Sequence, residues 1–257
     1  MVTKGLKQFL NQKVAHYNTP NFIPLDPIAI PHLYTRKEDI EIAGFLSATI
    51  AWGNRKMILK NAERMMAYMG DSPYDFVMTH REEHLLAIEN FAHRTFNTHD
   101  LVGFIKGLQH IYTHHNGLEA VFAKHQSPTS MQESISKFKS VFFEIEHLSR
   151  TQKHISDPMR GSAAKRINMF LRWMVRQDNN GVDFGIWKTI SPAILSCPVD
   201  VHSGNIARKL GLLTRTQNDA KAVQELDVQL RLLDPKDPVK YDFALFGLGV
   251  FDEFEYF

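Results

Sequence analysis

The sequence holds a single cysteine, Cys197, among its 257 residues. One thiol excludes a disulfide framework within the chain, and it excludes the several thiolates that an iron–sulfur cluster needs. No apolar run approaches the roughly 18 residues that a membrane-spanning helix requires. The amphipathic start, Met1 to Lys13, lacks the apolar core of a secretory signal. We therefore expect a cytoplasmic protein with no membrane contact and no iron–sulfur cluster.

An excess of charge of one sign is also missing. The formal net charge is +2 at pH 7, from 30 Lys and Arg against 28 Asp and Glu, with 13 His counted as neutral. A whole-chain basic signature for nucleic acid is thus absent, so any such surface must be local. With 44% hydrophobic and 23% charged residues, the composition fits a globular protein of one large domain or two small ones.

Strand-like alternation is almost absent as well, whereas apolar residues recur at helical spacing along most of the chain. Residues 38–69 predict two helices broken at Trp52-Gly53, the first apolar almost all round and the second capped by Asn54. Further helices are expected within residues 1–17, 74–126 (three short ones), 130–150 and 162–176, after an N-cap at Asn218 or Asp219, and within 239–249. The fold class is therefore all-α.

The segment from Pro198 to Leu212 carries the strongest candidate site. Pro198 favours an extended chain before it. Asp200 stands at an expected helix N-cap, because Val201, Ile206 and Leu210 follow helical spacing. The dipole and N–H groups of that helix favour an ionised carboxylate. A capping aspartate with no further role has the same pattern, so that alternative stays open.

Three features of the sequence occur in one order. They are Phe45-Leu46-Ser47 in the early apolar helix, a helix–break–helix around residues 130–176, and Val199-Asp200-Val201-His202 before a helix that bears Arg208 and ends at Leu210-Gly211-Leu212. This order resembles the helix-hairpin-helix DNA glycosylase superfamily. Three departures are visible. Val201 replaces the usual Thr, and the break holds one glycine, Gly161, where the superfamily's hairpin holds two. The interval from Lys165 to Asp200 is also longer than in the superfamily's commonest branches.

Two further runs, residues 165–176 and 237–250, resemble a bacterial family of uncharacterised proteins that is described as distantly related to those glycosylases. The resemblance implies a two-lobed all-α fold over residues 1–257. An inner-helix lobe would span about 36–150 and a helix-hairpin-helix lobe with the catalytic aspartate about 151–215, with C-terminal helices at 216–257 packing back on the core.

The resemblance further implies a DNA base-excision glycosylase that acts on damaged bases flipped from double-stranded DNA, as a monomer without a cofactor. Abasic-site lyase activity is left open. Asp200 would stabilise positive charge on the sugar, and Lys165 would attack C1′. Lys165 lies in the first turn of its helix among apolar residues, which disfavours the charged ammonium. A surface lysine on an amphipathic helix is the alternative.

The remaining candidates are contacts to DNA and to the flipped base. Trp52 is the candidate for the base pocket, with burial in the core as its alternative. Candidate DNA contacts, each with packing or solvent exposure as the alternative, are Arg55, Lys56, Arg160, Gly161, Ser162, His202 and Arg208.

His110 and His114 lie four residues apart on a predicted helix, a spacing that can hold a metal ion, but no carboxylate follows at matching spacing, so we expect no metal.

Two other functions remain open from the sequence. The chain could be a non-catalytic binder of DNA structure on the same fold. It could also be a helical scaffold or small-molecule protein in which Asp200 is only a cap. A scaffold or small-molecule protein should show no salt-dependent DNA binding, whereas a glycosylase and a non-catalytic DNA binder should both show it.

Overall fold

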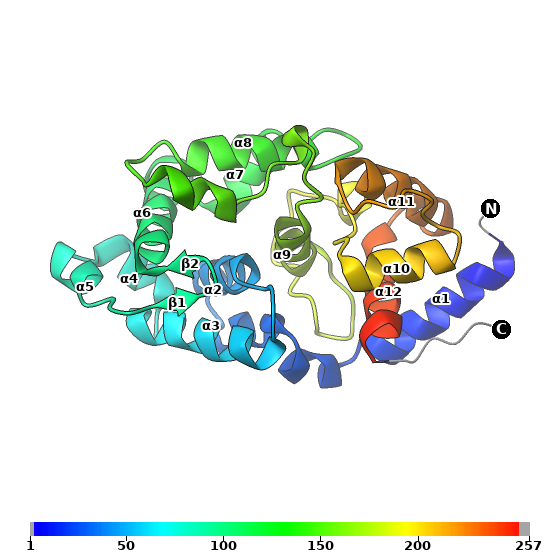
Figure 1. Cartoon of the computed structure of the whole chain (residues 1–257), viewed down its shortest axis with the longest axis horizontal. Helices are drawn as coiled ribbons and strands as arrows, with labels where there is room; N and C mark the ends of the chain where they lie inside the picture. Colours follow the sequence, from blue (N-terminus) through cyan, green and yellow to red (C-terminus); the bar gives the residue numbers. More distant parts are fainter. Residues whose placement is uncertain (1–2, 252–257) are drawn as a thin grey trace. The chain divides into compact units, whose positions relative to one another are not determined.

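The computed structural model describes residues 3–251, which form helices joined by turns and by longer irregular segments (Figure 1). Twelve α-helices occur in that range: α1 (Lys4–Tyr17), α2 (Lys37–Thr49), α3 (Arg55–Met69), α4 (Pro73–Thr79), α5 (Glu82–Leu86), α6 (Thr98–His114), α7 (Leu118–Lys124), α8 (Gln132–Phe142), α9 (Lys165–Val175), α10 (Val201–Lys209), α11 (Ala220–Leu233) and α12 (Tyr241–Val250). The predicted all-α class is confirmed.

Shorter elements connect these helices. The only strands between residues 3 and 251 are β1 (Ala92–His93) and β2 (Phe96–Asn97), which form an antiparallel pair. Seven 3₁₀ helices occur in the same range: η1 (Pro20–Leu25), η2 (Pro27–Ala29), η3 (Pro31–Leu33), η4 (Ser149–His154), η5 (Pro158–Arg160), η6 (Pro192–Ile194) and η7 (Pro238–Lys240). No helix within the described residues combines the length and apolarity needed to cross a bilayer.

The chain divides into two compact units. Unit 1 consists of residues 1–22, 126–133 and 157–257, and unit 2 consists of residues 23–125 and 134–156. Unit 2 therefore holds most of the expected inner-helix lobe, while unit 1 holds Lys165 and Asp200. Because both units are assembled from separated segments, neither corresponds to one continuous stretch of sequence.

The core of unit 2 is a cluster of phenylalanine rings around α2. Phe45 is fully buried and its ring centroid lies 5.7 Å from that of Phe104 and 5.5 Å from those of Phe138 and Phe142. Nearly every residue of α2 from Asp39 onward is buried, as its all-round apolar sequence predicts. The predicted N-cap of α3 is also confirmed, because the Asn54 side chain accepts a hydrogen bond from Met57 N.

Gly107 lets α8 lie close to α6. A Cβ atom at this position would lie 2.7 Å from two ring atoms of Phe142. The Phe142 ring is fully buried and packs against Phe45, Phe104 and Phe138, so it has no space into which to move. Glycine is thus required here by a close approach of two elements.

In unit 1, α12 packs against both α1 and α10 (Figure 1). Two glycines of α12 make these contacts close. A Cβ atom on Gly247 would lie 2.3 Å from the Tyr17 ring, and one on Gly249 would lie 3.0 Å from His202. Another helix of this unit, α9, is buried at every residue after Arg166.

Two of the expected elements differ in the structure. Residues 74–126 hold four helices and the small β-pair, where we expected three helices. The helix expected over residues 130–150 ends at Phe142, so the segment before the break consists of a turn, η4 and η5. The rings of Phe142 and Phe143 both pack against Phe104. Consecutive helical residues point about 100° apart, so this packing favours the end of the helix.

Replacing Gly107 with alanine tests the contact between α6 and α8. We expect Gly107→Ala to lower the free energy of unfolding by about 1–3 kcal/mol, because the new methyl group overpacks a rigid core. Urea denaturation followed by circular dichroism measures the change. Gly5→Ala is the control, since Gly5 lies in α1 with open space around it. Equal stabilities for the two variants would contradict the close approach.

Candidate active site

Asp200 is the N-cap of α10, as the sequence predicts. Its Oδ1 accepts hydrogen bonds from His202 N at 2.9 Å and Ser203 N at 3.0 Å. In return, Asp200 N donates to Ser203 Oγ at 3.0 Å, which completes a capping box. The helix terminus thereby fixes Oδ1. Because the carboxylate group is rigid and planar, the position of the other oxygen, Oδ2, is fixed as well.

Lys165 is the first residue of α9. The residue before it, Ala164, adopts a left-handed conformation with φ of 46° and is almost fully buried. Such a conformation costs a non-glycine residue roughly 1–3 kcal/mol, so the surrounding packing must impose it. Ala164 N donates to Ser162 Oγ at 3.1 Å, and Asn168 Nδ2 donates to Ala163 O at 3.0 Å. The start of α9 is therefore held by its own neighbours.

The structure brings Lys165 and Asp200 together. Lys165 Nζ lies 3.7 Å from Asp200 Oδ2, and each side chain is 24% exposed. An amine and a carboxylate that are 35 positions apart in sequence thus meet at the first turns of two helices. The pair is reachable from solvent, and its carboxylate is held at one oxygen only.

A buried carboxyl group, Asp242 on α12, interacts electrostatically with both members of this pair. Burial is the main cause that raises the pKa of Asp242 to about 6, and the negative charge of Asp200 adds to the effect. Arg172 of α9 opposes that shift through an ion pair with Asp242. Sequence reasoning missed Asp242, because an isolated aspartate in an apolar helix gives no sign of its partner.

Arg172 in α9 and Arg176, the C-cap residue of that helix, tie α9 to the rest of unit 1. Both are 3% exposed. Arg172 Nε lies 3.2 Å from Asp183, and Arg176 lies 3.1 Å from Asp183 and 3.0 Å from Asp237. Their guanidinium groups also lie over the ring of Phe243. A buried charge is stable only when it is paired, so these contacts fix the position of α9.

The chain that leads to Asp200 is anchored by Asp227 of α11. Cys197 N donates to Asp227 Oδ1 at 3.0 Å, and both residues are buried. Burial raises the pKa of Asp227 to about 6 and raises the pKa of the Cys197 thiol well above its usual value. Asp227 therefore positions the extended segment that carries Asp200.

Asn218 connects Asp200 to Arg208. Its Nδ2 donates to Asp200 O at 2.9 Å, and its Oδ1 accepts from Arg208 Nη2 at 2.6 Å. A Cβ atom at Gly204 would lie 2.7 Å from Asn218 Oδ1, so glycine at that position makes room for the amide. Arg208 Nε also donates to Arg215 O at 2.7 Å. The guanidinium of Arg208 thus stabilises the loop after α10. The DNA contact proposed for Arg208 from the sequence stays a prediction.

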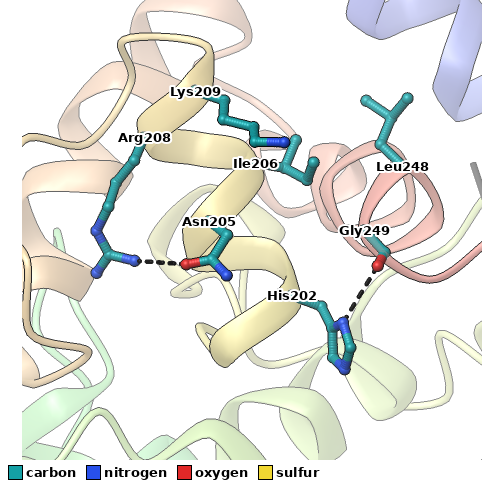
Figure 2. A pocket seen from close by; sticks show the side chains of 7 residues that line it. All are labelled: His202, Asn205, Ile206, Arg208, Lys209, Leu248 and Gly249. Atoms are coloured by element: carbon teal, nitrogen blue, oxygen red, sulfur yellow. Dashed lines mark hydrogen bonds between the residues drawn. The ribbon is translucent and has the colours of Figure 1, made fainter. Parts of the chain in front are cut away.

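A groove of about 420 Å³ runs along α10 and the end of α12. Its lining includes three side chains that can be cationic, from His202, Arg208 and Lys209, together with Asn205 (Figure 2). Figure 2 also shows His202 Nδ1 facing Gly249 O, at 3.1 Å, and Arg208 Nη1 facing Asn205 Oδ1, at 3.4 Å. This groove offers hydrogen-bond donors of the kind that contact phosphates.

The break before α9 is a tight 3₁₀ turn. Gly161 has φ of 90°, and its N–H donates to Pro158 O at 2.9 Å. The N–H groups of Arg160 and Ser162 both donate to Asp157 O. These three N–H groups are consequently used inside the turn. Any phosphate contact here would depend on the exposed Arg160 side chain and the Ser162 hydroxyl.

The other predicted residues belong to unit 2. Trp52 is half-buried, and its ring lies edge-on to that of His93, with centroids 5.0 Å apart. Arg55 and Lys56 form the first turn of α3. The assignments of Trp52 to a base pocket and of Arg55 and Lys56 to DNA stay predictions.

Within residues 3–251, one group of side chains has the arrangement of metal ligands. It consists of His110, His115 and Glu144 of unit 2, whose ligand atoms all lie within 4.8 Å of one another. The pair considered from sequence, His110 and His114, is not that group. Spacing along one helix could not reveal this group, because its carboxylate, Glu144, lies 34 positions after His110.

Comparison with known proteins identifies the family. Residues 26–251 match the family described as "Protein of unknown function (DUF2400)". The chain belongs to this family. No curated protein and no solved structure matches it significantly. The match includes α9, α10 and α12, so the Lys165–Asp200 pair lies within the family's region. The likeness to helix-hairpin-helix glycosylases stays a prediction.

Two substitutions separate the capping role of Asp200 from its charge. We expect Asp200→Ala to lower the free energy of unfolding by about 0.5–2 kcal/mol, because the cap is lost. Asp200→Asn keeps an oxygen that can accept from His202 N and Ser203 N, so its stability should lie within about 0.5 kcal/mol of wild type. Thermal and urea denaturation measure both. A large loss in Asp200→Asn would mean that the charge itself supports the fold.

The raised pKa of the buried Asp227 carboxyl group should make the stability of the protein depend on pH. The folded-state pKa of Asp227 is raised to about 6 from 3.8. The folded protein thus holds a proton that the unfolded chain has released between about pH 4 and 6, and this contribution to stability falls as pH rises. Asp227→Asn removes it while keeping an acceptor for Cys197 N. As pH rises through that window, the free energy of unfolding of the variant should increase relative to that of wild type by about 1 kcal/mol per pH unit. Urea denaturation between pH 4 and 7 tests this, and parallel pH profiles would contradict it.

Proposed function

We propose that this protein excises damaged bases from double-stranded DNA, with Lys165 and Asp200 as its catalytic pair. The observation that carries the proposal is the 3.7 Å separation of Lys165 Nζ and Asp200 Oδ2. The sequence around both residues resembles helix-hairpin-helix DNA glycosylases, a likeness that does not depend on this distance. The Val199-Asp200-Val201-His202 motif supports the same assignment.

The chemistry assigns a different task to each member of the pair. Cleavage of an N-glycosidic bond builds positive charge on the sugar, which the Asp200 carboxylate would stabilise. Asp200 would also accept a proton from the Lys165 ammonium, leaving a neutral amine. That amine would attack C1′ as the bond to the base breaks, and the departing base would take the proton that Asp200 had accepted. The sugar ring would then open as one proton moves from the new C1′ ammonium to the ring oxygen, which leaves a protonated Schiff base. The same intermediate permits strand cleavage at an abasic site.

The geometry of unit 1 suits this task. Asp200 Oδ1 is held by two backbone N–H groups, so Oδ2 keeps its orientation toward Lys165. Lys165 follows a buried residue with a strained backbone, Ala164. Strained backbone concentrates at functional sites, where packing maintains it at a cost in stability. Both features favour a preorganised pair over two independent surface charges.

Phosphate contacts would come from the side chains near the pair. Arg160 and Ser162 precede Lys165, and His202 and Lys209 line the groove along α10. The near-neutral net charge of the chain agrees with such a local surface. The binding affinity should therefore fall with salt, with a slope that reflects a few phosphate contacts.

Borohydride trapping tests the proposal. The full chain is incubated with short duplexes that contain an abasic site, 8-oxoguanine, uracil or an alkylated purine, and borohydride then reduces any Schiff base. We expect a covalent adduct with at least one substrate. Lys165→Ala should abolish the adduct, and Asp200→Asn should slow base release by about 10²–10⁴-fold.

Lys221→Ala is the control for loss of a lysine, because Lys221 is exposed on α11 and lies outside the proposed site. Base release without an adduct, lost in Asp200→Asn only, would retain the glycosylase and exclude Lys165 as the nucleophile. Salt-dependent binding with no base release from any substrate would contradict the proposed activity and indicate a non-catalytic binder of DNA.

A further inference from the structure

We propose that His110, His115 and Glu144 of unit 2 bind one divalent transition-metal ion of the zinc class. This site is separate from the Lys165–Asp200 pair, which belongs to unit 1. Two imidazoles and one carboxylate are a common ligand set for such ions, and three protein ligands leave a position for water or another molecule.

The distances among the three ligand atoms fit an ion. His110 Nε2 lies 3.1 Å from Glu144 Oε2 and 3.2 Å from His115 Nε2, and His115 Nε2 lies 3.5 Å from Glu144 Oε2. A zinc ion with bonds of roughly 2.0–2.1 Å to nitrogen and oxygen keeps its tetrahedral ligand atoms about 3.3 Å apart. The three atoms thus form a triangle of the size that one face of such a tetrahedron has.

The end of α6 places both histidines. His110 lies in the last turns of α6, and His115 is its C-cap. The backbone then reverses at Asn116, with φ of 58°, and at Gly117, with φ of 89°. His115 N and Gly117 N both donate to Ile111 O, which closes the helix end and keeps the His115 ring near that of His110, with centroids 5.0 Å apart.

The end of α8 brings the carboxylate. Glu144 follows the last residue of α8 by two positions, and its N–H donates to Val141 O at 3.2 Å. The close approach of Phe142 to Gly107 holds this end of α8 beside α6, and Gly107 lies one turn before His110. A constraint of the hydrophobic core therefore fixes the spacing between Glu144 and the two histidines.

The electrostatic environment favours a cation. The cluster lies at the C-terminal ends of two helices, α6 and α8, where the helix dipole gives a partial negative charge. Glu144 adds a full negative charge and is half exposed, whereas the histidine side chains are 19% and 25% exposed. The ligand atoms are thus partly shielded from water, and an ion can still enter.

His110 also lines a groove of about 1320 Å³ in unit 2. Four further histidines line the same groove: His80, His99, His114 and His147. The open position of the bound ion would face an aqueous surface that a small oxygen or nitrogen ligand can reach. This arrangement is typical of an ion that binds an exchangeable ligand, since purely structural zinc sites have four protein ligands.

Cobalt titration tests the site in the full chain. The protein is stripped with a chelator and dialysed, Co²⁺ is added, and the visible absorption of the ion is recorded. We expect the bands of a four- or five-coordinate ion at one equivalent, displaced by Zn²⁺. His115→Ala and Glu144→Gln should each weaken binding at least about tenfold, since even the loss of an outer partner costs that much. Metal content after dialysis gives the stoichiometry independently.

His114→Ala is the matched control. His114 neighbours His110 on α6, with ring centroids 5.1 Å apart, but it is not part of the triad. Binding by this variant should equal that of wild type. The absence of stoichiometric Co²⁺ and Zn²⁺ binding would overturn the proposal. So would an equal loss in His114→Ala, because the ligands would then be the two histidines four residues apart.

Discussion

The fold of unit 1 depends on two buried cations, Arg172 and Arg176, that are satisfied only when α9 is in one position. Their carboxylate partners come from the loop after α9 and from the region of α12. Placing a charge in a protein interior costs several kcal/mol unless it is paired with good geometry. Sliding α9 by one turn would leave these charges unpaired. Because Lys165 is the first residue of α9, the fixed position of this helix also fixes the geometry of the candidate active site.

The position of Lys165 follows directly. Arg172 is seven residues beyond Lys165, which is close to two helical turns, so both side chains project from nearly the same face of α9. Asp242 forms an ion pair with Arg172, and the charges of Lys165 and Asp200 shift the pKa of Asp242. The register that pairs Arg172 with Asp242 therefore also sets the distance between Lys165 and the cap of α10.

Local features were predictable from the sequence, and distant partners were not. Asn54 and Asp200 were identified as N-caps because capping depends on a few adjacent residues. Asp242 and Asp227 could not be recognised, because their partners lie tens of residues away. Only the resemblance to a family assigns Lys165 and Asp200 to one candidate site from the sequence. No periodicity predicts that two helices begin at the same point in space.

The interleaving of the units has a consequence for synthesis of the protein on the ribosome. Every segment of unit 2 has been made once residue 156 leaves the ribosome, so that unit can fold early. Unit 1 cannot, because α1 packs against α12, and more than 220 residues separate these two helices along the chain. The face of α1 that packs against α12 therefore stays uncovered until α12 has been made.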